Sequence, residues 1–254
     1  MEPATLRRRK DQAAYDVDSL LAVFHSKFIS NVAYVDQGLP HCLPMTALVE
    51  KQDNFLCITL HGHPSSRLIE LVRKADQEAR DGNVPIGTDN RIRVCITATH
   101  VDGLSLSSAP NGHEFNYRSA VVHGACSLVK DRDQKFQAMH LLTNHIVPHR
   151  WEEVNPVSSF QVSLVQVIKV EVLSGSVKSR TGIPQIQPRN TGKDGPDLPY
   201  PVWTGIIPLY EVLGVPVDSG LTDDAAVPPS VLAYIQKRNK QHKEYAELVS
   251  KKKL

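Results

Sequence analysis

The stretch Leu60-His61-Gly62-His63-Pro64-Ser65-Ser66-Arg67-Leu68-Ile69-Glu70-Leu71 joins two segments with different hydrophobic periods. Residues 55–60, which lead into it, are apolar and rich in β-formers and predict a strand, whereas the apolar residues at 68, 69, 71 and 72 recur at helical spacing. Gly62 and Pro64 break the strand, and Ser65 or Ser66 is placed to cap the following helix. The sequence therefore predicts a strand, a turn and a helix that runs to about Arg80.

The predicted start of this helix has the chemistry of an anion site. A helix N-terminus offers free backbone donors and the positive end of the helix dipole, and Arg67 can donate two parallel bonds to an oxyanion such as a phosphate. A capped surface helix with a solvated Arg67 is the commoner arrangement of the same residues. Taken alone, these residues leave both interpretations open.

Strands and a helix are also predicted before this stretch. Asp16 or Asp18 can cap an amphipathic helix over residues 20–28. Residues 31–35, 41–49 and 55–60 have strand patterns, with polar turns between them. We expect these three strands to pair in order as an antiparallel meander.

After the helix, residues 81–90 are turn formers and predict an exposed loop. Strands are predicted at 91–101, at 104–106 beyond an Asp102-Gly103 hairpin, at 118–129 and at 158–173. Asp131 is expected to cap a helix that Pro148 closes. Residues 174–201 are rich in Gly, Pro and Ser and predict a long loop, and a last helix is expected to begin near Pro228.

Six or more antiparallel strands with interspersed helices predict an α+β chain built on a β-barrel, since closure removes the exposed edges of a sheet. A chain of 254 residues is long enough for one such domain with appendages. We expect a domain over residues 1–227, which includes the N-terminal helix, and a basic C-terminal helix and tail over 228–254.

Charge and cysteine usage restrict the class of protein. The 29 Lys+Arg and 27 Asp+Glu residues give a net charge of +2, so nucleic acid is not expected as a principal partner. The basic runs at 7–10 and 251–253 are typical of solvated tails. No apolar run is long enough to span a bilayer, and four cysteines without C-x-x-C spacing favour a reducing compartment. We therefore expect a soluble cytoplasmic protein with no membrane contact.

Common catalytic and metal motifs are absent from the sequence. It has no G-x-S-x-G nucleophile elbow, no Walker A loop, no G-x-G-x-x-G and no H-E-x-x-H. His61 and His63 are two apart, and Pro148 ends the helix between His145 and His149. Because the histidines do not cluster with cysteines or acids at ligand spacing, no metal site is predicted.

A second polar cluster, Asn116-Tyr117-Arg118-Ser119, leads into the strand predicted at 118–129. Strand alternation places Tyr117 and Ser119 on one face and Arg118 on the other. Such a cluster is either an ordinary strand edge or a set of groups that orient a polar ligand. Trp203, one of two tryptophans, ends the predicted long loop, and core packing is its simpler interpretation.

Together these segments resemble the FMN-binding split-barrel superfamily, in particular its pyridoxamine 5′-phosphate oxidase-like branch with the nitroimidazole-resistance-type proteins. The resemblance extends over residues 7–215 and is carried by the following segments: the basic start with Ala14-Tyr15-Asp16, Leu43-Pro44-Met45-Thr46, Leu60-His61-Gly62, Ser65-Ser66-Arg67, Thr97 with Asp102-Gly103-Leu104, Asn116-Tyr117-Arg118-Ser119 with Gly124, Val147-Pro148-His149-Arg150-Trp151, Ser176-Val177-Lys178-Ser179-Arg180 with Gly182, and Pro201-Val202-Trp203-Thr204-Gly205 with Pro208-Leu209.

The resemblance implies a homodimer of split β-barrels with two FMN sites at the subunit interface. It places residues 44–47 along the flavin, residues 65–67 at the phosphate and residues 116–119 at the completion of the pocket. The assignment of a cofactor-binding role by this resemblance is weaker for Lys178, Arg180 and Trp203, which lie in or at the end of the long loop. The implied cofactor-binding residues are Pro44, Met45, Thr46, Ala47, His61, Ser65, Ser66, Arg67, Asn116, Tyr117, Arg118, Ser119, Lys178, Arg180 and Trp203.

The superfamily includes several activities, so the fold does not choose among them. The leading hypothesis is an FMN-dependent oxidoreductase with a small-molecule substrate and with NAD(P)H as a possible reductant. A flavin-binding or regulatory protein without turnover is the second hypothesis, and a haem-binding relative is the third. The flavin itself would carry the redox chemistry, and the sequence indicates no catalytic base.

Overall fold

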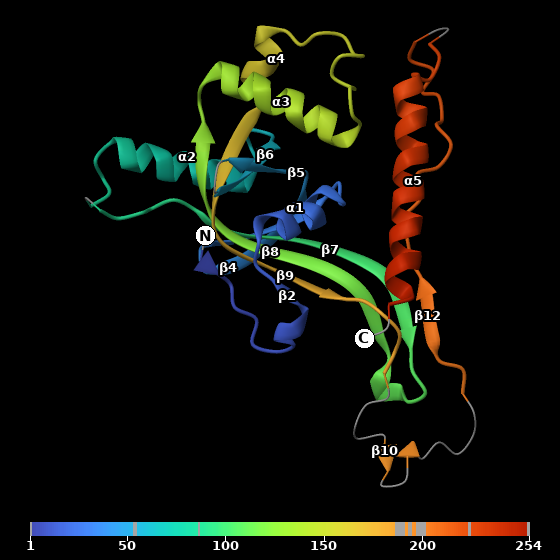
Figure 1. The fold of residues 1–254 in the computed structure, drawn as a ribbon. Helices are drawn as coiled ribbons and strands as arrows, with labels where there is room; N and C mark the ends of the chain where they lie inside the picture. The colour runs from blue at the N-terminus through green and yellow to red at the C-terminus, as the bar shows by residue number, and fades with distance from the viewer. Residues whose placement is uncertain are drawn as a thin grey trace. The chain divides into compact units, whose positions relative to one another are not determined.

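The computed structural model describes residues 2–52, 55–85, 87–185, 191–192, 195–196, 202–222 and 225–252 (Figure 1). The chain forms two compact units. Unit 1 comprises Met1–Thr99 and Ser119–Lys178, and unit 2 comprises His100–Arg118 and Ser179–Leu254. The domain boundary expected at residue 227 stays a prediction.

Unit 1 is organised around a sheet in which the strand order is β4-β3-β7-β8-β9-β6-β5. The pairs β3–β4, β3–β7, β5–β6 and β6–β9 are antiparallel. Two short strands, β1 (Glu2–Pro3) and β2 (Ala13–Ala14), also pair with β9. The strands of the path are β3 (Ser30–Asp36), β4 (Leu39–Met45), β5 (Ala47–Gln52), β6 (Phe55–Gly62), β7 (Arg93–Leu106), β8 (Glu114–Val129) and β9 (Gln166–Arg180).

The two ends of this strand path are joined by a single residue. β4 ends at Met45 and β5 begins at Ala47, so only Thr46 separates the first strand of the path from the last. A flat sheet would hold these strands several strand widths apart, at about 4.8 Å per strand. The sheet must therefore curl until its ends approach each other, as in a barrel.

The core of unit 1 lies within this curled sheet and under α1 (Val17–His25). Leu20 and Phe24 of α1 are buried together with strand residues such as Ile58, Ile96 and Ile168. Asp16 caps α1 because its carboxylate accepts the Ser19 backbone N–H at 2.8 Å.

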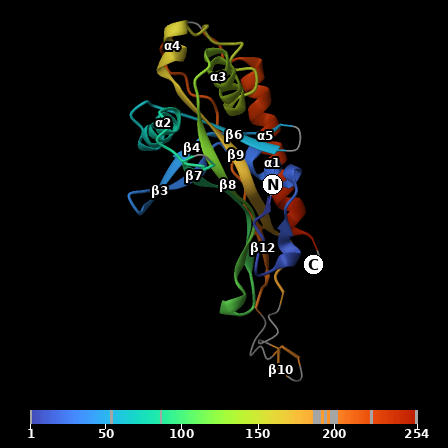
Figure 2. The same ribbon diagram turned by 90° about the vertical axis from the view of Figure 1, so that its left-hand side faces the viewer.

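Three further helices belong to unit 1. α2 (Arg67–Arg80) buries Leu68, Ile69 and Val72 against the core. α3 (Arg132–Ile146) and α4 (Ser159–Leu164) lie side by side (Figures 1 and 2), and the Arg132 guanidinium donates to the Ser159 hydroxyl. The helices thus cover a β core from its outside.

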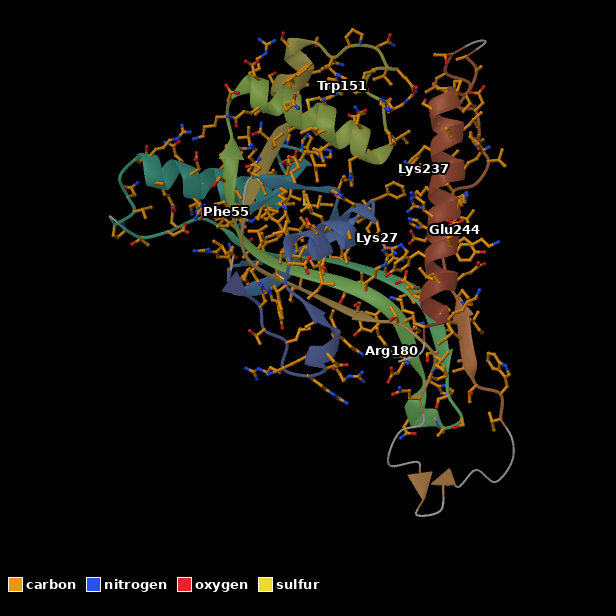
Figure 3. The ribbon with its side chains drawn as sticks, in the orientation of Figure 1. Lys27, Phe55, Trp151, Arg180, Lys237 and Glu244 are labelled. Carbon is orange, nitrogen blue, oxygen red and sulfur yellow. The ribbon has the colours of Figure 1, made fainter. Side chains whose placement is uncertain are left out.

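Unit 2 combines the 100–106 part of β7 with β12 (Gly205–Pro208) and with α5 (Pro229–Ser250). β12 pairs antiparallel with β7, with Gly205 opposite Leu106 and Pro208 opposite Gly103. β12 also contacts α5. The remaining strands, β10 (Thr191–Gly192) and β11 (Gly195–Pro196), pair with each other. Lys237 and Glu244, labelled in Figure 3, lie in the middle part of α5.

The expected α+β class is confirmed: an antiparallel sheet curled like a barrel, peripheral helices and a C-terminal helix are all present. The expected meander is wrong. β3–β4 and β5–β6 form two separate hairpins, because the chain bends at Thr46 instead of continuing as one strand over 41–49.

Three other predictions need correction. Asp102-Gly103 is not a hairpin turn but lies inside the continuous strand β7. Residues 159–164 are helical, because Ser158 and Gln161 form a reciprocal capping box. Residues 174–180, expected in a loop, continue β9. The remainder of that expected loop falls partly outside the described residues.

No helix in the described part of the chain is both long enough and apolar enough to cross a bilayer.

Candidate functional site

The start of α2 differs from the starts of the other helices of unit 1. The side chains of Asp16, Asp131 and Ser158 accept backbone N–H groups at the N-termini of α1, α3 and α4. Ser66 occupies the same position in α2 with extended backbone angles, but its side chain accepts no such bond. The first-turn N–H groups of α2 are therefore left without a side-chain cap and can donate to an anion.

Arg67 begins α2 and binds a carboxylate through its guanidinium fork. Its Nε donates to Asp36 Oδ2 at 2.6 Å and its Nη2 to Asp36 Oδ1 at 3.0 Å. Hydrogen bonding from Arg67 holds the pKa of Asp36 below its ordinary value. The Arg67 side chain is 46% exposed, so it can be reached from solvent. A phosphate at this position would share the guanidinium with Asp36, a partner that the sequence pattern did not reveal.

The turn before α2 is held by His63, which sequence reasoning did not assign to the site. The Ser65 backbone N–H donates to His63 Nδ1 at 3.2 Å, and the Ser65 hydroxyl lies 2.6 Å from the same nitrogen. Two serine groups converge on one ring nitrogen, so His63 fixes the position of Ser65. The signal in the sequence was the spacing of two residues between His63 and Ser65, which lets a polar side chain accept the backbone N–H two residues later, as in an Asx turn.

The segment 44–47 lies next to this turn. Ala47 pairs with Leu60 in the β5–β6 ladder, one residue before His61. A Cβ placed on Gly62 would lie 3.6 Å from Ile69 of α2 and 4.0 Å from Met45. These contacts place Met45 and Ala47 beside the end of β6 and α2, whereas the Arg67 guanidinium lies at Asp36, toward the other end of β3. We call Pro44, Met45, Thr46, Ala47, His61, Ser65, Ser66 and Arg67 the α2 group.

The other predicted site residues lie near the ends of β8 and β9. In unit 1 the Ser119 hydroxyl donates to the Lys178 backbone carbonyl at 3.3 Å. In unit 2 the buried Arg180, labelled in Figure 3, donates to the Asn116 side-chain carbonyl at 2.5 Å and forms an ion pair with Glu114. We call Asn116, Tyr117, Arg118, Ser119, Lys178 and Arg180 the strand-end group.

Arg118 and Trp203 have different surroundings. The Arg118 guanidinium donates two bonds to Asp102, each at 3.2 Å, and lies 3.9 Å above the Tyr245 ring. Trp203 is 66% exposed, and its ring lies so close to Gly205 that a Cβ there would be 2.6 Å away. Trp203 is therefore not a core residue, which corrects the simpler interpretation of its role.

β9 separates the α2 group from Ser119 and Lys178 within unit 1. Gly62, at the end of β6, pairs with Gln166, the first residue of β9. Ala13 pairs with Lys178, near the other end of β9. At ~3.3 Å per residue, β9 advances about 40 Å between Gln166 and Lys178. The two sets of residues therefore lie at opposite ends of the same strand.

Unit 1 also has a groove of about 570 Å³. It is mainly apolar and is lined by residues of β3, β4, β7, β8 and β9, among them Tyr34, Arg93, His123 and Leu173, and by Arg91 just before β7. None of the predicted cofactor residues lines this groove. It is distinct from the α2 group.

Burial disfavours the thiolate form of three of the four cysteines. All four are free thiols. Burial raises the pKa of Cys126 to about 12 and also raises the pKa of Cys57 and Cys95. Cys42 is exposed.

Comparison of the sequence with family models gives one match, to the family described as pyridoxamine 5′-phosphate oxidase, over residues 16–179. The matched range contains the whole α2 group, residues 116–119 and Lys178, but not Arg180 or Trp203. A comparison with curated proteins gives no match.

Two solved structures are similar over most of the chain. The flavocytochrome Anf3 from Azotobacter vinelandii has a TM-score of 0.71 and 22% identity, and the alignment covers 90% of this chain and 94% of that one. The FAD and heme binding protein from Mycobacterium smegmatis has a TM-score of 0.70 and 19% identity, with 88% and 97% covered. These alignments establish a shared fold, and together with the family match they confirm the expected split-barrel architecture.

Proposed function

We propose, from the premise that the chain belongs to the pyridoxamine 5′-phosphate oxidase family, that it binds FMN and acts as a flavin-dependent oxidoreductase on a small molecule. The observation that carries this proposal is the α2 group. It combines an uncapped helix start, an arginine that solvent can reach and the adjoining segment 44–47.

The residues of the α2 group fit a flavin phosphate. Backbone N–H groups at the start of α2 are donors, and Arg67 adds a positive charge whose fork suits an oxyanion. Residues 44–47 offer backbone groups beside which a flat ring can lie. Asp36 opposes the phosphate by its charge but keeps Arg67 in place.

The separation of the two groups supports a homodimer with FMN at the interface. No single flavin mononucleotide can reach along about 40 Å of β9 from the α2 group to Lys178. If both groups contact the same cofactor, one must come from each of two chains. A two-fold dimer supplies two equivalent sites of this kind.

The flavin would supply the hydride or electron chemistry when bound, with NAD(P)H as the proposed electron donor. The protein's own residues bind and orient it. Arg67 and the α2 N-terminus neutralise the phosphate. No described residue is assigned as a catalytic base.

A second candidate is a protein that carries haem as well as flavin. One of the two similar structures is named a flavocytochrome, and the other is named an FAD and heme binding protein. Their alignments cover 90% and 88% of this chain and must therefore include much of unit 2. The family match, in contrast, ends at residue 179. Unit 2 is therefore where a haem would be sought.

The experiment is to purify the full chain without a tag, record its visible spectrum and identify the cofactor released by acid. We expect flavin absorbance, release of FMN and a dimer by light scattering. A colourless protein that takes up neither FMN nor FAD contradicts the flavin proposal, release of FAD corrects the cofactor, and a Soret band supports the haem candidate. A monomer at saturating FMN contradicts the interface site.

Turnover is tested separately under anaerobic conditions. NADPH or NADH is expected to bleach the bound flavin, and oxygen or an electrophilic acceptor to restore its colour. Tight flavin binding without bleaching by either nucleotide favours the non-catalytic flavin-binding protein.

A further inference from the structure

Three side chains of unit 2 converge on one point. They are His100 in β7, Glu211 in the segment after β12, and His242 in α5. One potential ligand atom from each lies within 4.8 Å of the other two. His100 is only 2% exposed, and its ring meets the His242 ring edge to face with 5.2 Å between the centroids. Three donors from three distant parts of the sequence therefore meet in one place.

The backbone around these residues is fixed by hydrogen bonds. The Leu209 N–H donates to the Asp102 carbonyl at 3.1 Å, next to the β7–β12 ladder. The Asn239 side chain both accepts the Leu213 N–H and donates to the Leu213 carbonyl, each at 2.8 Å. Asn239 lies three residues before His242 and so on the same side of α5. These bonds hold the Glu211 segment against the helix that carries His242.

Charged side chains lie close to two of these three donors. Asp102 Oδ1 lies 3.6 Å from His100 Nδ1, and Arg118 donates two bonds to the same carboxylate. The 3.6 Å separation is longer than a hydrogen bond, so Asp102 would orient the His100 ring as an outer partner only after the two groups approach by a few tenths of an ångström. Arg238, four residues before His242 in α5, pairs with Glu211 at 3.4 Å. That contact is long and Glu211 is 52% exposed, so the carboxylate can turn toward an ion.

We propose that His100, Glu211 and His242 form a binding site for a divalent transition-metal ion of the Zn²⁺ class. Two imidazoles and one carboxylate form a ligand set that Zn²⁺ accepts, with a fourth position open to water. Ligand atoms around a tetrahedral Zn²⁺ lie about 3.3 Å apart, so the three donors need to close by no more than about 1.5 Å.

The geometry favours an ion over a haem at this point. Axial ligands of one haem iron stand on opposite faces of the macrocycle, which must fit between them. Here the two imidazoles are in edge-to-face contact, and a carboxylate is the third converging group. An ion bound by all three residues would tie β7, the segment after β12 and α5 to one another. The site stands independently of the proposed flavin function.

The test uses the full-length, untagged protein after chelator treatment, with Zn²⁺ as the probe. A chromophoric chelator in competition gives the stoichiometry and affinity, and Co²⁺ spectra report the coordination. We expect one Zn²⁺ per chain and a Tm that rises by several degrees at saturation, because the ion binds only the folded state. Loss of an outer partner alone weakens metal sites by about 10- to 100-fold, so His242→Ala is expected to weaken binding by at least about 100-fold.

The control is His123→Ala, which removes an exposed histidine of β8 and is expected to leave Zn²⁺ affinity unchanged. Glu211→Gln tests the oxygen ligand and, like His242→Ala, changes a side chain that is not fully buried, so the test stands even if His100→Ala does not fold. Equal Zn²⁺ affinity in the wild type, His242→Ala and Glu211→Gln overturns the proposal. So does stoichiometric haem uptake whose Soret band disappears in His242→Ala.

Discussion

Unit 1 and unit 2 bury different kinds of side chain. In unit 1 the core is a continuous cluster of Leu, Ile, Val and Phe residues from α1, α2 and the sheet. Among the described residues of unit 2 the buried apolar side chains are Ala246 and Val249, whereas the buried polar ones are His100, Asp102, Ser105, Ser107, Asn116, Arg180, Arg238 and Ser250.

This difference has energetic consequences. Burial of apolar surface stabilises a fold without regard to direction, and small losses are spread over many contacts. Buried charges instead need their specific partners, because an uncompensated charge in a low dielectric is costly. We therefore expect unit 1 to respond mainly to changes in volume, and unit 2 to changes in charge. An ion at His100, Glu211 and His242 would supply a compact source of stability where the apolar core is small.

Two tryptophans allow the units to be followed separately. Trp151 lies in unit 1 against Phe136, with 5.2 Å between their ring centroids (Figure 3), and Trp203 lies in unit 2. Trp203→Phe leaves a fluorophore in unit 1 alone, and Trp151→Phe leaves one in unit 2 alone. The predictions on unfolding use these two backgrounds.

The largest effect is expected for Arg118→Met in unit 2. It leaves Asp102, whose side chain is 3% exposed, without its bidentate partner. Removal of one member of a buried pair costs about 3–5 kcal/mol. Denaturant unfolding followed by Trp203 should show this loss. Lys240→Met on α5, where the lysine is 74% exposed, should change the free energy by less than about 0.5 kcal/mol. Equal effects of the two substitutions would contradict the ionic account of unit 2.

The next effect is expected for Ile58→Ala in unit 1. Ile58 is fully buried, and truncation of a buried isoleucine costs about 2–5 kcal/mol through lost transfer free energy and the cavity that remains. Unfolding followed by Trp151 measures it. Phe55→Ala on the same strand is the control, because Phe55 (Figure 3) is 58% exposed and its loss should cost little. A larger effect at Phe55 than at Ile58 would indicate that this face of β6 is covered in solution.

Arg67→Met is expected to have an intermediate effect on cofactor affinity. Hydrogen bonds to a charged group contribute about 1.5–3 kcal/mol, so FMN should bind about ten- to a hundredfold more weakly. Riboflavin, which lacks the phosphate, should bind the wild type and the variant equally. Fluorescence-quenching titrations with both flavins measure this. Equal FMN affinity removes Arg67 from the site, and an equal loss for both flavins indicates damaged folding.

Asp36→Asn is the matched variant for this experiment. It removes the carboxylate that now shares Arg67 while it preserves the shape of the side chain. FMN affinity should stay the same or increase, since one negative charge near the phosphate is lost. A decrease as large as that of Arg67→Met would mean that Asp36 is needed to position the arginine.

The smallest effect is expected for Asp89→Asn on the surface of unit 1. Hydrogen bonding from Arg91 lowers the pKa of Asp89 to about 2, below the ordinary value of 3.8. The carboxylate therefore stabilises the folded state above about pH 4, and this contribution disappears as the pH falls toward 2. Because both side chains are 34% exposed, solvent screening limits the contribution to less than about 1 kcal/mol. Unfolding at pH 7 and pH 2 with Trp151 as the probe should show a small difference from the wild type only at pH 7.

Local signals in the sequence predicted the parts of the fold that depend on neighbouring residues. Asp16 and Asp131 cap their helices as expected, and α2 starts at the predicted serines. Within the α2 group, the local pattern indicated only the helix start at Ser65, Ser66 and Arg67, whereas residues 44–47 and His61 were expected from the family resemblance. The predicted role of each residue in binding a cofactor stays a prediction.

Long-range packing explains the errors. Gly103 was taken as a turn residue, but a Cβ there would lie 2.9 Å from Ile206 and 3.1 Å from the Ile207 carbonyl, so glycine allows β12 to approach β7. The sequence pattern predicted a loop at Gly175, but this glycine lies in β9 and lets Leu20 and Val122 pack closely against the strand. A Cβ on Gly175 would lie 3.1 Å from each of these two side chains. In both cases glycine serves close packing inside a strand and not a change of chain direction.

The proposed metal site of unit 2 also depends on long-range packing that the sequence did not reveal. His100, Glu211 and His242 have no short spacing that a motif could describe, and only the pairing of β7 with β12 and the packing of α5 bring them together. A search for metal-binding motifs in the sequence could therefore not have found this cluster.

The position of β9 in the sheet has a consequence for biosynthesis. β9 is the partner of β6, but it leaves the ribosome after β6 by roughly 100 residues, which at about 5–20 residues per second takes roughly 5–20 s. During that time the nascent chain presents one uncharged edge of β6, Phe55-Leu56-Cys57-Ile58-Thr59-Leu60, with its intended neighbour not yet made. Such an edge can pair with another nascent chain on the same polysome. We therefore expect the yield of folded protein to rise when translation is slowed by lower temperature or sparser initiation, since both reduce the number of chains waiting for β9 at one time.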